Sequence, residues 1–322
     1  MKTLQSLVVL AALLAGTVNL SFAQSYPSRA IRFMVPVAAG SGFDINSRMI
    51  AERLAKKFGQ PVVVENQPGA GTALGVGTIA KAAPDGYTIG MMLSPVTIQQ
   101  TLMSKMGFDA RKDLAPIILL GWDFSLLTVT NDVPATSVQQ LIDYLKANPD
   151  RINYASGGNG TPAHIAAEFF KQTTGTQMVH VPYKAADMAV QDLLAGRVQV
   201  MFGNVPATLP HIRSGKLRAL AVVGKKRLAL LPDLPSMADL GFPNIDVPNW
   251  QGIVAPAGTH EAVISLLYRE IAAAVADPEV AQRMGRGSTV IDIQPPEVLK
   301  KMIAEDIDRW AEVIRKAGIQ GN

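Results

Sequence analysis

IRFMVPVAAGSGFD, residues 31–44, decides the fold class, because it reads as a strand, a glycine-rich turn and the start of a helix. Residues 31–37 form a short apolar run of the kind found in buried strands. The turn AAGSGF, residues 38–43, leads to Asp44, a residue type that caps helices well. From Asp44 to Phe58, apolar side chains at positions 45, 49, 50, 54 and 58 recur near one helical face. The stretch therefore predicts one strand–turn–helix unit.

The same order of elements recurs along the chain. A strand at residues 62–64 is followed by a glycine-rich segment and a small helix, and residues 84–86 (PDG) turn into a strand at 87–93. A second series begins near Leu126. Its expected strands are 126–130, 152–155, 178–183 and 198–202, and its expected helices are 138–147, 162–173, 186–195 and 205–214. This alternation predicts parallel sheets with helices on both faces.

The length of 322 residues indicates roughly two domains. Residues 232–256 contain five prolines, which excludes one regular element there and favours a crossing between two lobes. The tail from Glu261 onward reads as helical. We expect an α/β fold in which residues 24–122 and 226–322 form one lobe and residues 123–225 form the other. Each lobe is expected to hold a mostly parallel sheet flanked by helices, with a ligand cleft between the lobes.

The composition excludes several classes of protein. Apolar residues make up 48% and charged residues 17%, so the chain is not disordered. The formal charge of +4 is scattered, and nucleic-acid binding is not expected because it needs a concentrated basic stripe. The lack of cysteine excludes disulfides, thiolate metal sites and cysteine nucleophiles.

Residues 1–23 read as a secretory signal. Lys2 provides the charged start, residues 7–14 the apolar stretch, and Ser21 to Ala23 the small residues before a cleavage site after Ala23. A membrane anchor is the alternative, but the unbroken apolar run is shorter than the roughly 20 residues that span a bilayer. We therefore expect export, most naturally into a bacterial periplasm.

A second turn resembles the first. After a strand that ends at Ala155, residues 156–160 (SGGNG) lead to Thr161 as the helix cap and Pro162 as the first helical residue. Each turn is expected to present backbone N–H groups and the positive end of a helix dipole at the carboxyl edge of a sheet. Such a position suits an anion. We expect the two turns to face each other across the cleft.

Nucleotide, metal and hydrolytic chemistry find little support. Ile45 and Leu74 stand where a dinucleotide fingerprint needs glycine, and no glycine loop is followed by Gly-Lys-Ser/Thr. The four histidines lack metal-ligand spacing, so neither a metal nor a cofactor is expected. Ser156, His164 and Asp187 can be drawn as a triad, but no Gly-x-Ser-x-Gly elbow surrounds the serine. We do not expect an enzyme, and a periplasmic hydrolase is the less favoured alternative.

Other polar residues have two readings each. His164 either contacts a ligand or is a surface or capping histidine, and the sequence favours neither. Lys184, after Tyr183, offers a cation to a carboxylate or is simply solvated, and Asn204 is a comparable candidate. Trp250 either lines the cleft or is buried, which is the ordinary state of tryptophan. Capping alone accounts for Asp44.

Nine motifs, in order along the chain, resemble the Bug family of extracytoplasmic solute receptors of tripartite tricarboxylate transporters. They are YPSR (26–29), IRFMVPVAAGSGFD (31–44), GQPVVVENQPGAG (59–71), KAAPDGYT (81–88), YASGG (154–158), VPYK (181–184), LLAGRVQVMF (193–202), GKLRALAV (215–222) and APAGT (255–259).

The resemblance implies a two-lobed, periplasmic-binding-protein-like fold that closes on a small carboxylate and delivers it to membrane permease subunits. In the family, backbone groups and ordered waters between the two loops hold one carboxylate group. A monomer is expected, and a ligand sensor for a two-component system is the alternative role. The positions at the cleft are Val37, Ala38, Ala39, Gly42, Phe43, Asp44, Ser94, Ser156, Gly158, Gly160, Thr161, His164, Tyr183, Lys184, Gly203, Asn204 and Trp250.

Three departures from the family pattern bear on the ligand. The first loop has Val37, Ser41 and Phe43 where Phe, Gly and Thr are usual, and Ala185 replaces a glycine. Gly203 replaces the usual aspartate, which removes a partner for a ligand ammonium and is expected to leave space. Phe43 is expected to add an aromatic wall. We therefore expect a rigid or aromatic carboxylate rather than an amino acid.

Overall fold

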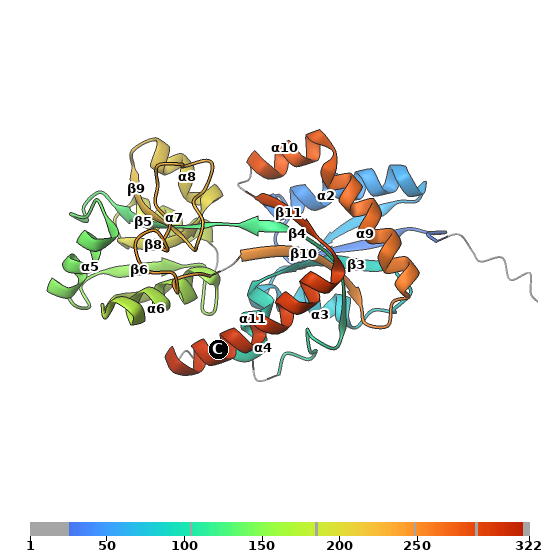
Figure 1. Cartoon of the computed structure of the whole chain (residues 1–322), viewed down its shortest axis with the longest axis horizontal. Helices are drawn as coiled ribbons and strands as arrows, with labels where there is room; N and C mark the ends of the chain where they lie inside the picture. Colours follow the sequence, from blue (N-terminus) through green and yellow to red (C-terminus); the bar gives the residue numbers. More distant parts are fainter. Residues whose placement is uncertain (1–25, 104, 184–185, 248, 287–288, 318–322) are drawn as a thin grey trace, which may run out of the picture.

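The computed structural model describes residues 26–103, 105–183, 186–247, 249–286 and 289–317. The signal segment 1–23 and Lys184 lie outside these residues, as does Ala185. The chain forms two sheets, each with flanking helices, and the sheets lie end to end along the long axis of the molecule (Figure 1). No helix within the described ranges has the length and apolar character needed to cross a membrane.

The first lobe is built on a six-stranded sheet in the order β11-β4-β10-β3-β1-β2. Its strands are β1 (Ile31–Val35), β2 (Val62–Asn66), β3 (Thr88–Leu93), β4 (Leu114–Asp123), β10 (Asn249–Pro256) and β11 (Val290–Gln294). Its helices are α2 (Gly42–Phe58), η1 (Ala70–Thr72), α3 (Ala73–Ala80), α4 (Pro95–Leu102), α9 (Glu261–Ala276), α10 (Pro278–Arg286) and α11 (Pro296–Ala317).

The second lobe is built on a five-stranded sheet in the order β7-β6-β8-β5-β9. Its strands are β5 (Ser125–Thr130), β6 (Asn153–Ser156), β7 (Val179–Pro182), β8 (Val200–Asn204) and β9 (Leu217–Val223). Its helices are α5 (Val138–Ala147), α6 (Pro162–Thr174), α7 (Ala186–Leu194) and α8 (Val205–Arg213).

Both sheets are mixed rather than wholly parallel. In the first lobe, β1 to β4 run in one direction and β10 and β11 run in the other. In the second lobe, only β5 runs against its neighbours. The exception has a simple cause. Because Phe124 alone separates β4 from β5, β5 must begin at the crossing where the other strands of its sheet end.

This topology brings the carboxyl ends of β1 to β4 and of β6 to β9 to the side of each sheet that faces the crossing between the lobes. The last residue of β4, Asp123, pairs with Asn249 at the start of β10, the strand that returns to the first lobe. At the other side, Ser125 pairs with Asn204 at the end of β8 and with Val223 at the end of β9. Helices that follow these strands therefore begin at the crossing.

Separate apolar cores hold the lobes, and α11 connects them. Along α11, Ile303 and Ile307 pack in a cluster of the first lobe with Trp250 and Met34. Further along the helix, Trp310 and Ile314 pack in the cluster of the second lobe. Figure 1 shows the same helix reaching beneath the second lobe. Packing against α11 therefore ties the two lobes together in addition to the crossing strands.

Candidate functional site

A cavity of about 450 Å³ lies where the chain crosses between the lobes. The first lobe contributes the start of α2, and the second lobe contributes the junction of β8 with α8. The crossing strands β4 and β10, the helix α10 and the residue before β11 also contribute. The lining residues are Ser41, Gly42, Phe43, Ile45, Asn46, Asp123, Asn204, Pro206, Ala207, Asn249, Arg283 and Thr289.

The start of α2 presents two backbone amides to this cavity. Ser41, rather than the expected Asp44, is the helix cap, and its hydroxyl accepts a hydrogen bond from the Asp44 N–H at 3.3 Å. The Ile45 N–H bonds to the Ser41 carbonyl at 3.0 Å. The first N–H groups of a helix have no partner within the helix. Neither the Gly42 N–H nor the Phe43 N–H donates a hydrogen bond to a described residue, so both remain available to an anion.

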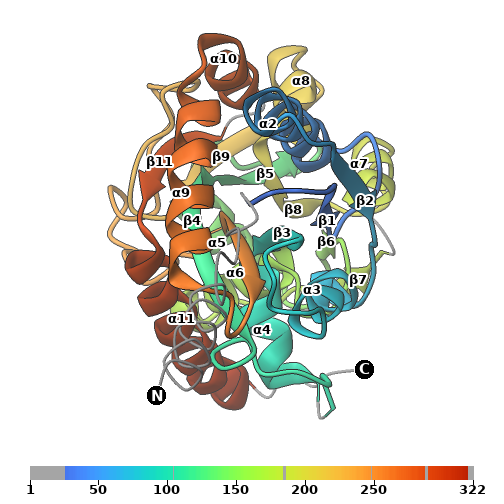
Figure 2. The same ribbon diagram turned by 90° about the vertical axis from the view of Figure 1, so that its right-hand side faces the viewer.

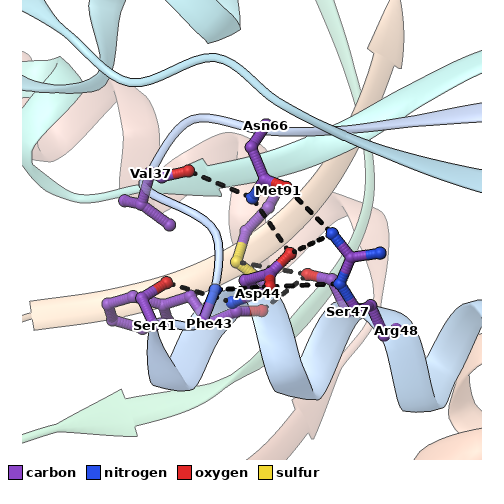
Figure 3. A network of polar contacts seen from close by, with 9 residues as sticks. Val37, Ser41, Phe43, Asp44, Ser47, Arg48, Asn66 and Met91 are labelled. Atoms are coloured by element: carbon purple, nitrogen blue, oxygen red, sulfur yellow. Dashed lines mark hydrogen bonds and ion pairs between the residues drawn. The ribbon is translucent and has the colours of Figure 1, made fainter.

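Asp44 fixes the turn from within (Figure 3). Its buried carboxylate accepts the Gly40 N–H at 2.8 Å, the Asn66 amide at 2.9 Å and the Arg48 guanidinium at 3.1 Å. Burial raises the pKa of Asp44, but these hydrogen bonds outweigh it, so the pKa lies below its usual value. The side chain is thus a structural anion with its oxygens engaged, in agreement with its expected structural role.

The second lobe faces the cavity with the start of α8. The Val205 N–H bonds to the Phe124 carbonyl at 3.2 Å, and Pro206 has no N–H. Ala207, which follows Pro206, lines the cavity and has a backbone N–H. Asn204, which is exposed, lines the same cavity. From the first lobe, the Asn46 side chain is 5% exposed, lines the same cavity and has no hydrogen-bond partner among the described residues. The cavity is therefore rich in donors from both lobes.

The second glycine-rich turn has the same geometry as the first but does not line this cavity. Thr161 caps α6 by accepting the His164 N–H at 3.5 Å. The Gly160 N–H bonds to His164 Nδ1 at 3.0 Å, and the Gly158 N–H bonds to Ser156 Oγ at 3.1 Å. Pro162 has no N–H to offer. Side chains of the turn thus occupy amides that the sequence led us to expect at the ligand.

A stack of three rings supports this second turn. His164 lies on His180 with ring centroids 4.1 Å apart, and His180 lies on Tyr154 at 4.7 Å. Ser156 Oγ is 2.7 Å from His180 Nε2 and is fully buried. Burial lowers the pKa of His164, and burial together with the neighbouring His164 lowers that of His180 to about 4. His164 is therefore a buried neutral acceptor that shapes its own turn.

The second turn packs against the first lobe. A Cβ placed on Gly160 would lie 2.2 Å from Leu102 Cδ1 and 2.9 Å from Gln99 Nε2, both on α4. The second turn therefore lies directly against α4 at Gly160.

Several other expected site residues act at a distance from the cavity. Ser94 is buried, and its hydroxyl bonds to Asn249, a lining residue, at 3.1 Å. The Tyr183 hydroxyl donates to Asp192 at 2.7 Å, away from the cavity. Trp250 is 1% exposed and donates its Nε1 hydrogen to Asp306 at 2.6 Å, so it belongs to the core.

Gly203 corrects one detail of the expected ligand space. It is buried, and a Cβ there would lie 2.7 Å from Thr208 Cγ2 and 3.3 Å from Met201 Sδ. The methyl group of Thr208 therefore fills the space expected in place of the aspartate side chain. Relative to an aspartate, Gly203 therefore removes a negative charge but does not enlarge the ligand space.

The crossing strands supply a group that sequence reasoning missed. Asp123 lines the cavity and accepts hydrogen bonds from Thr289 Oγ1 at 2.8 Å and Gln251 Nε2 at 3.1 Å. Burial raises the pKa of Asp123 to about 6, although both hydrogen bonds oppose the rise. Nothing in the local sequence of Asp123, Thr289 or Arg283 marks them. Asp123 and Thr289 meet through the sheet pairing of β4, β10 and β11, and Arg283 is placed by the packing of α10.

Known proteins resemble this chain over most of its length. A family model described as "Tripartite tricarboxylate transporter family receptor" matches residues 46–319. Protein BugT of Bordetella pertussis is 38% identical over 299 residues, which cover 92% of this chain and 91% of BugT.

Two solved structures with bound ligands have the same fold. Rpa4515 of Rhodopseudomonas palustris, solved with adipate, has a TM-score of 0.82 at 30% identity and covers 92% of this chain and 100% of its own. MatC from the same organism, solved with malate, has a TM-score of 0.78 at 28% identity and covers 90% of this chain and 100% of its own.

The fold and the interlobe cavity define a two-lobed periplasmic binding protein, as the sequence predicted. The chain belongs to the receptor family of tripartite tricarboxylate transporters. A member of this family binds solute and is not an enzyme. The buried Ser156–His180 pair is accordingly a structural hydrogen bond.

Proposed function

We propose that the protein captures a small carboxylate in the cavity between its lobes and delivers it to membrane components of a tripartite transporter. The observation that carries this proposal is the pair of unbonded N–H groups on Gly42 and Phe43, two residues that line a cavity to which both lobes contribute. Two N–H groups at a helix start, reinforced by the helix dipole, form a ready site for one carboxylate group.

Contacts from both lobes would couple binding to closure. Gly42, Phe43 and Asn46 belong to the first lobe, and Asn204 and Ala207 belong to the second. A ligand that touches both sets stabilises the closed arrangement by its differential affinity for that arrangement. Residues 24–122 with 226–322 and residues 123–225 would then move as two bodies about the crossing strands. The leader-like segment 1–23 supports export before this cycle begins.

The ligand is inferred to be a rigid or aromatic carboxylate rather than an amino acid. Phe43 provides an aromatic surface in the cavity wall, and Gly203 supplies no acid to pair with an ammonium group. Asp123 already accepts two hydrogen bonds from Thr289 and Gln251. The adipate and malate bound by the two solved relatives support a carboxylate of modest size.

Isothermal titration of the mature chain tests this proposal. The panel consists of benzoate, benzene-1,4-dicarboxylate (terephthalate), adipate, malate, citrate, aspartate and glutamate. We expect tight binding of at least one aromatic carboxylate, with a rise in unfolding free energy of about 2.7 kcal/mol when the ligand is at 100 times its Kd. Tight binding of aspartate or glutamate would overturn the ligand class, and no binding of any carboxylate would overturn the function.

A further inference from the structure

Arg283 is a cation in the wall of the cavity without an acidic partner. It is exposed on α10, lines the cavity, and makes no ion pair or hydrogen bond with any residue that the structure describes. Asp123 lines the same cavity, yet its oxygens bond to Thr289 and Gln251 and not to the guanidinium. The charge of Arg283 is thus available to an anion that enters the cavity.

Ion pairs at the start of α10 set the direction of this helix. Arg53, on the far part of α2, donates to Asp277 at 3.0 Å and to Glu279 at 2.5 Å. The other end of α10 carries Arg283 and lines the cavity together with Gly42, at the opposite end of α2. The two helices therefore run antiparallel. They lie next to each other, as Figure 2 shows. This pairing places Arg283 in the wall of the cavity that Gly42 and Phe43 also line.

The end of α10 is held as well. Val280 and Met284, one helical turn apart, are fully buried in the core of the first lobe. Beyond the helix, the Thr289 N–H bonds to the Met284 carbonyl at 3.2 Å, and its hydroxyl bonds to Asp123 at 2.8 Å. Both ends of the segment that bears Arg283 are therefore fixed to the first lobe.

We propose that Arg283 binds a second carboxylate group of the ligand, while the amides of Gly42 and Phe43 bind the first. This inference rests on the proposed function and deepens it by assigning the residue that selects dicarboxylates over monocarboxylates. A guanidinium matches a carboxylate with two parallel N–H donors, which a lysine cannot reproduce. Because both anion-binding groups belong to the first lobe, the ligand lies across that lobe before the second lobe closes with Asn204.

Matched ligand pairs separate this role from a general contribution to the cavity. Terephthalate is compared with 4-carbamoylbenzoate, and adipate with its monoamide, by titration against wild type, Arg283→Gln and Arg283→Lys. Arg213→Gln serves as the charge control, since Arg213 is an exposed arginine on α8 that does not line the cavity. Unfolding midpoints of the unliganded variants show whether each is folded.

We expect Arg283→Gln to lose affinity for dicarboxylates selectively. Arg283→Gln should weaken dicarboxylate binding about 10- to 50-fold, as for loss of a charge-assisted pair, and change monoamide binding less than about 2-fold. Arg283→Lys should recover part of the loss, and Arg213→Gln should change nothing. Equal losses for both members of each pair, or no loss, would overturn the role of Arg283 while leaving the proposed function intact. Failure of the wild type to bind any member would overturn both.

Discussion

The two glycine-rich turns of this protein have the same hydrogen-bond pattern, but only the first lines the cavity between the lobes. In each, a glycine with positive φ, Gly40 or Gly160, precedes a cap residue, Ser41 or Thr161. Each glycine N–H is accepted by the side chain four residues later, Asp44 at 2.8 Å in the first turn and His164 at 3.0 Å in the second. The cap hydroxyl accepts the N–H three residues on in both.

They differ at the first helical residue and in their surroundings. Gly42 keeps an N–H that lines the cavity, whereas Pro162 has none. The first turn borders open space, since a Cβ on Gly40 would have no neighbour within 4 Å, and the second packs against α4. This difference is why we propose the first turn, whose amides are both present and uncovered, as the anion site.

The largest difference between the turns should appear when each glycine gains a methyl group. Gly160→Ala combines a positive φ with contact to Leu102, so we expect a loss of about 2–4 kcal/mol in unfolding free energy. Gly40→Ala is the matched control, because it has the same strained φ without a neighbour and should lose about 1 kcal/mol. Urea titrations of both variants give the comparison. Equal losses would mean that the packing of the second turn against α4 contributes nothing.

Exchange of the first helical residues tests whether the amide makes the site. Gly42→Pro removes one N–H, and the extended backbone of Ser41 (φ −67°, ψ 161°) accommodates a following proline. We expect stability to hold and carboxylate affinity to fall about 10- to 100-fold, as for loss of a hydrogen bond to a charged group. Pro162→Ala is the control and should leave affinity within about 2-fold. The proposed site fails if calorimetry finds both variants equal to wild type.

Acid should weaken the second turn before the first. Burial lowers the pKa of His164 and of His180, the latter to about 4, so their stabilising contribution is full above pH 6.5 and lost as pH falls towards 4. The lowered pKa of Asp44 keeps the first turn intact until the pH is below about 3.8. We expect a loss of roughly 1 kcal/mol by pH 5, allowing for the partly exposed His180.

Thermal unfolding between pH 7 and 4 measures this loss, with His164→Asn as the control. Asparagine can accept the Gly160 N–H without titrating, so the pH dependence should become shallower. An unchanged slope in this variant would show that His164 does not titrate on unfolding.

An effect of similar size to that of acid is expected for Asp123, the acid at the cavity that the first turn also lines. Its pKa of about 6 is above the unfolded value, so its contribution to stability is full below about pH 4 and lost as pH rises through 6. Asp123→Asn should therefore raise the unfolding free energy by about 1 kcal/mol at pH 7.5 and by nothing at pH 4. Gln251 Oε1 is buried without a partner and can accept the new amide if the side chain rotates. An Asp123→Asn variant with a lower unfolding free energy than wild type at both pH values would contradict this expectation.

Sequence patterns over a few residues predicted the helix starts and ends that depend on capping and on an apolar face. The helix Val138–Ala147 begins and ends where the sequence indicates, because Ser137 caps it and its apolar side chains share one face. Thr161 and Pro162 start α6 as expected. The helix α2 begins at Gly42 rather than at the expected Asp44, because Ser41 is its cap.

Long-range pairing could not be predicted in the same way. The strand β4 pairs with both β10 and β11 although Asp123 and Thr289 are far apart in sequence, and none of the three was expected as a strand. The antiparallel direction of β5 follows from its continuity with β4 rather than from any residue pattern. The site residues that depend on the pairing of β4 with β10 and β11 were missed for the same reason.

The residues alone determined the α/β class, the two glycine-rich turns and their caps, since each depends on neighbours within a few positions. Only the packing of helices and strands decided that the first turn opens onto a cavity. The same packing decided that Arg283 lines that cavity. Arg283 lines the same cavity as the start of α2 because α10 packs on α2, and His164 accepts the Gly160 N–H while it stacks on His180. Such contacts depend on geometry between distant segments, which no local spacing encodes.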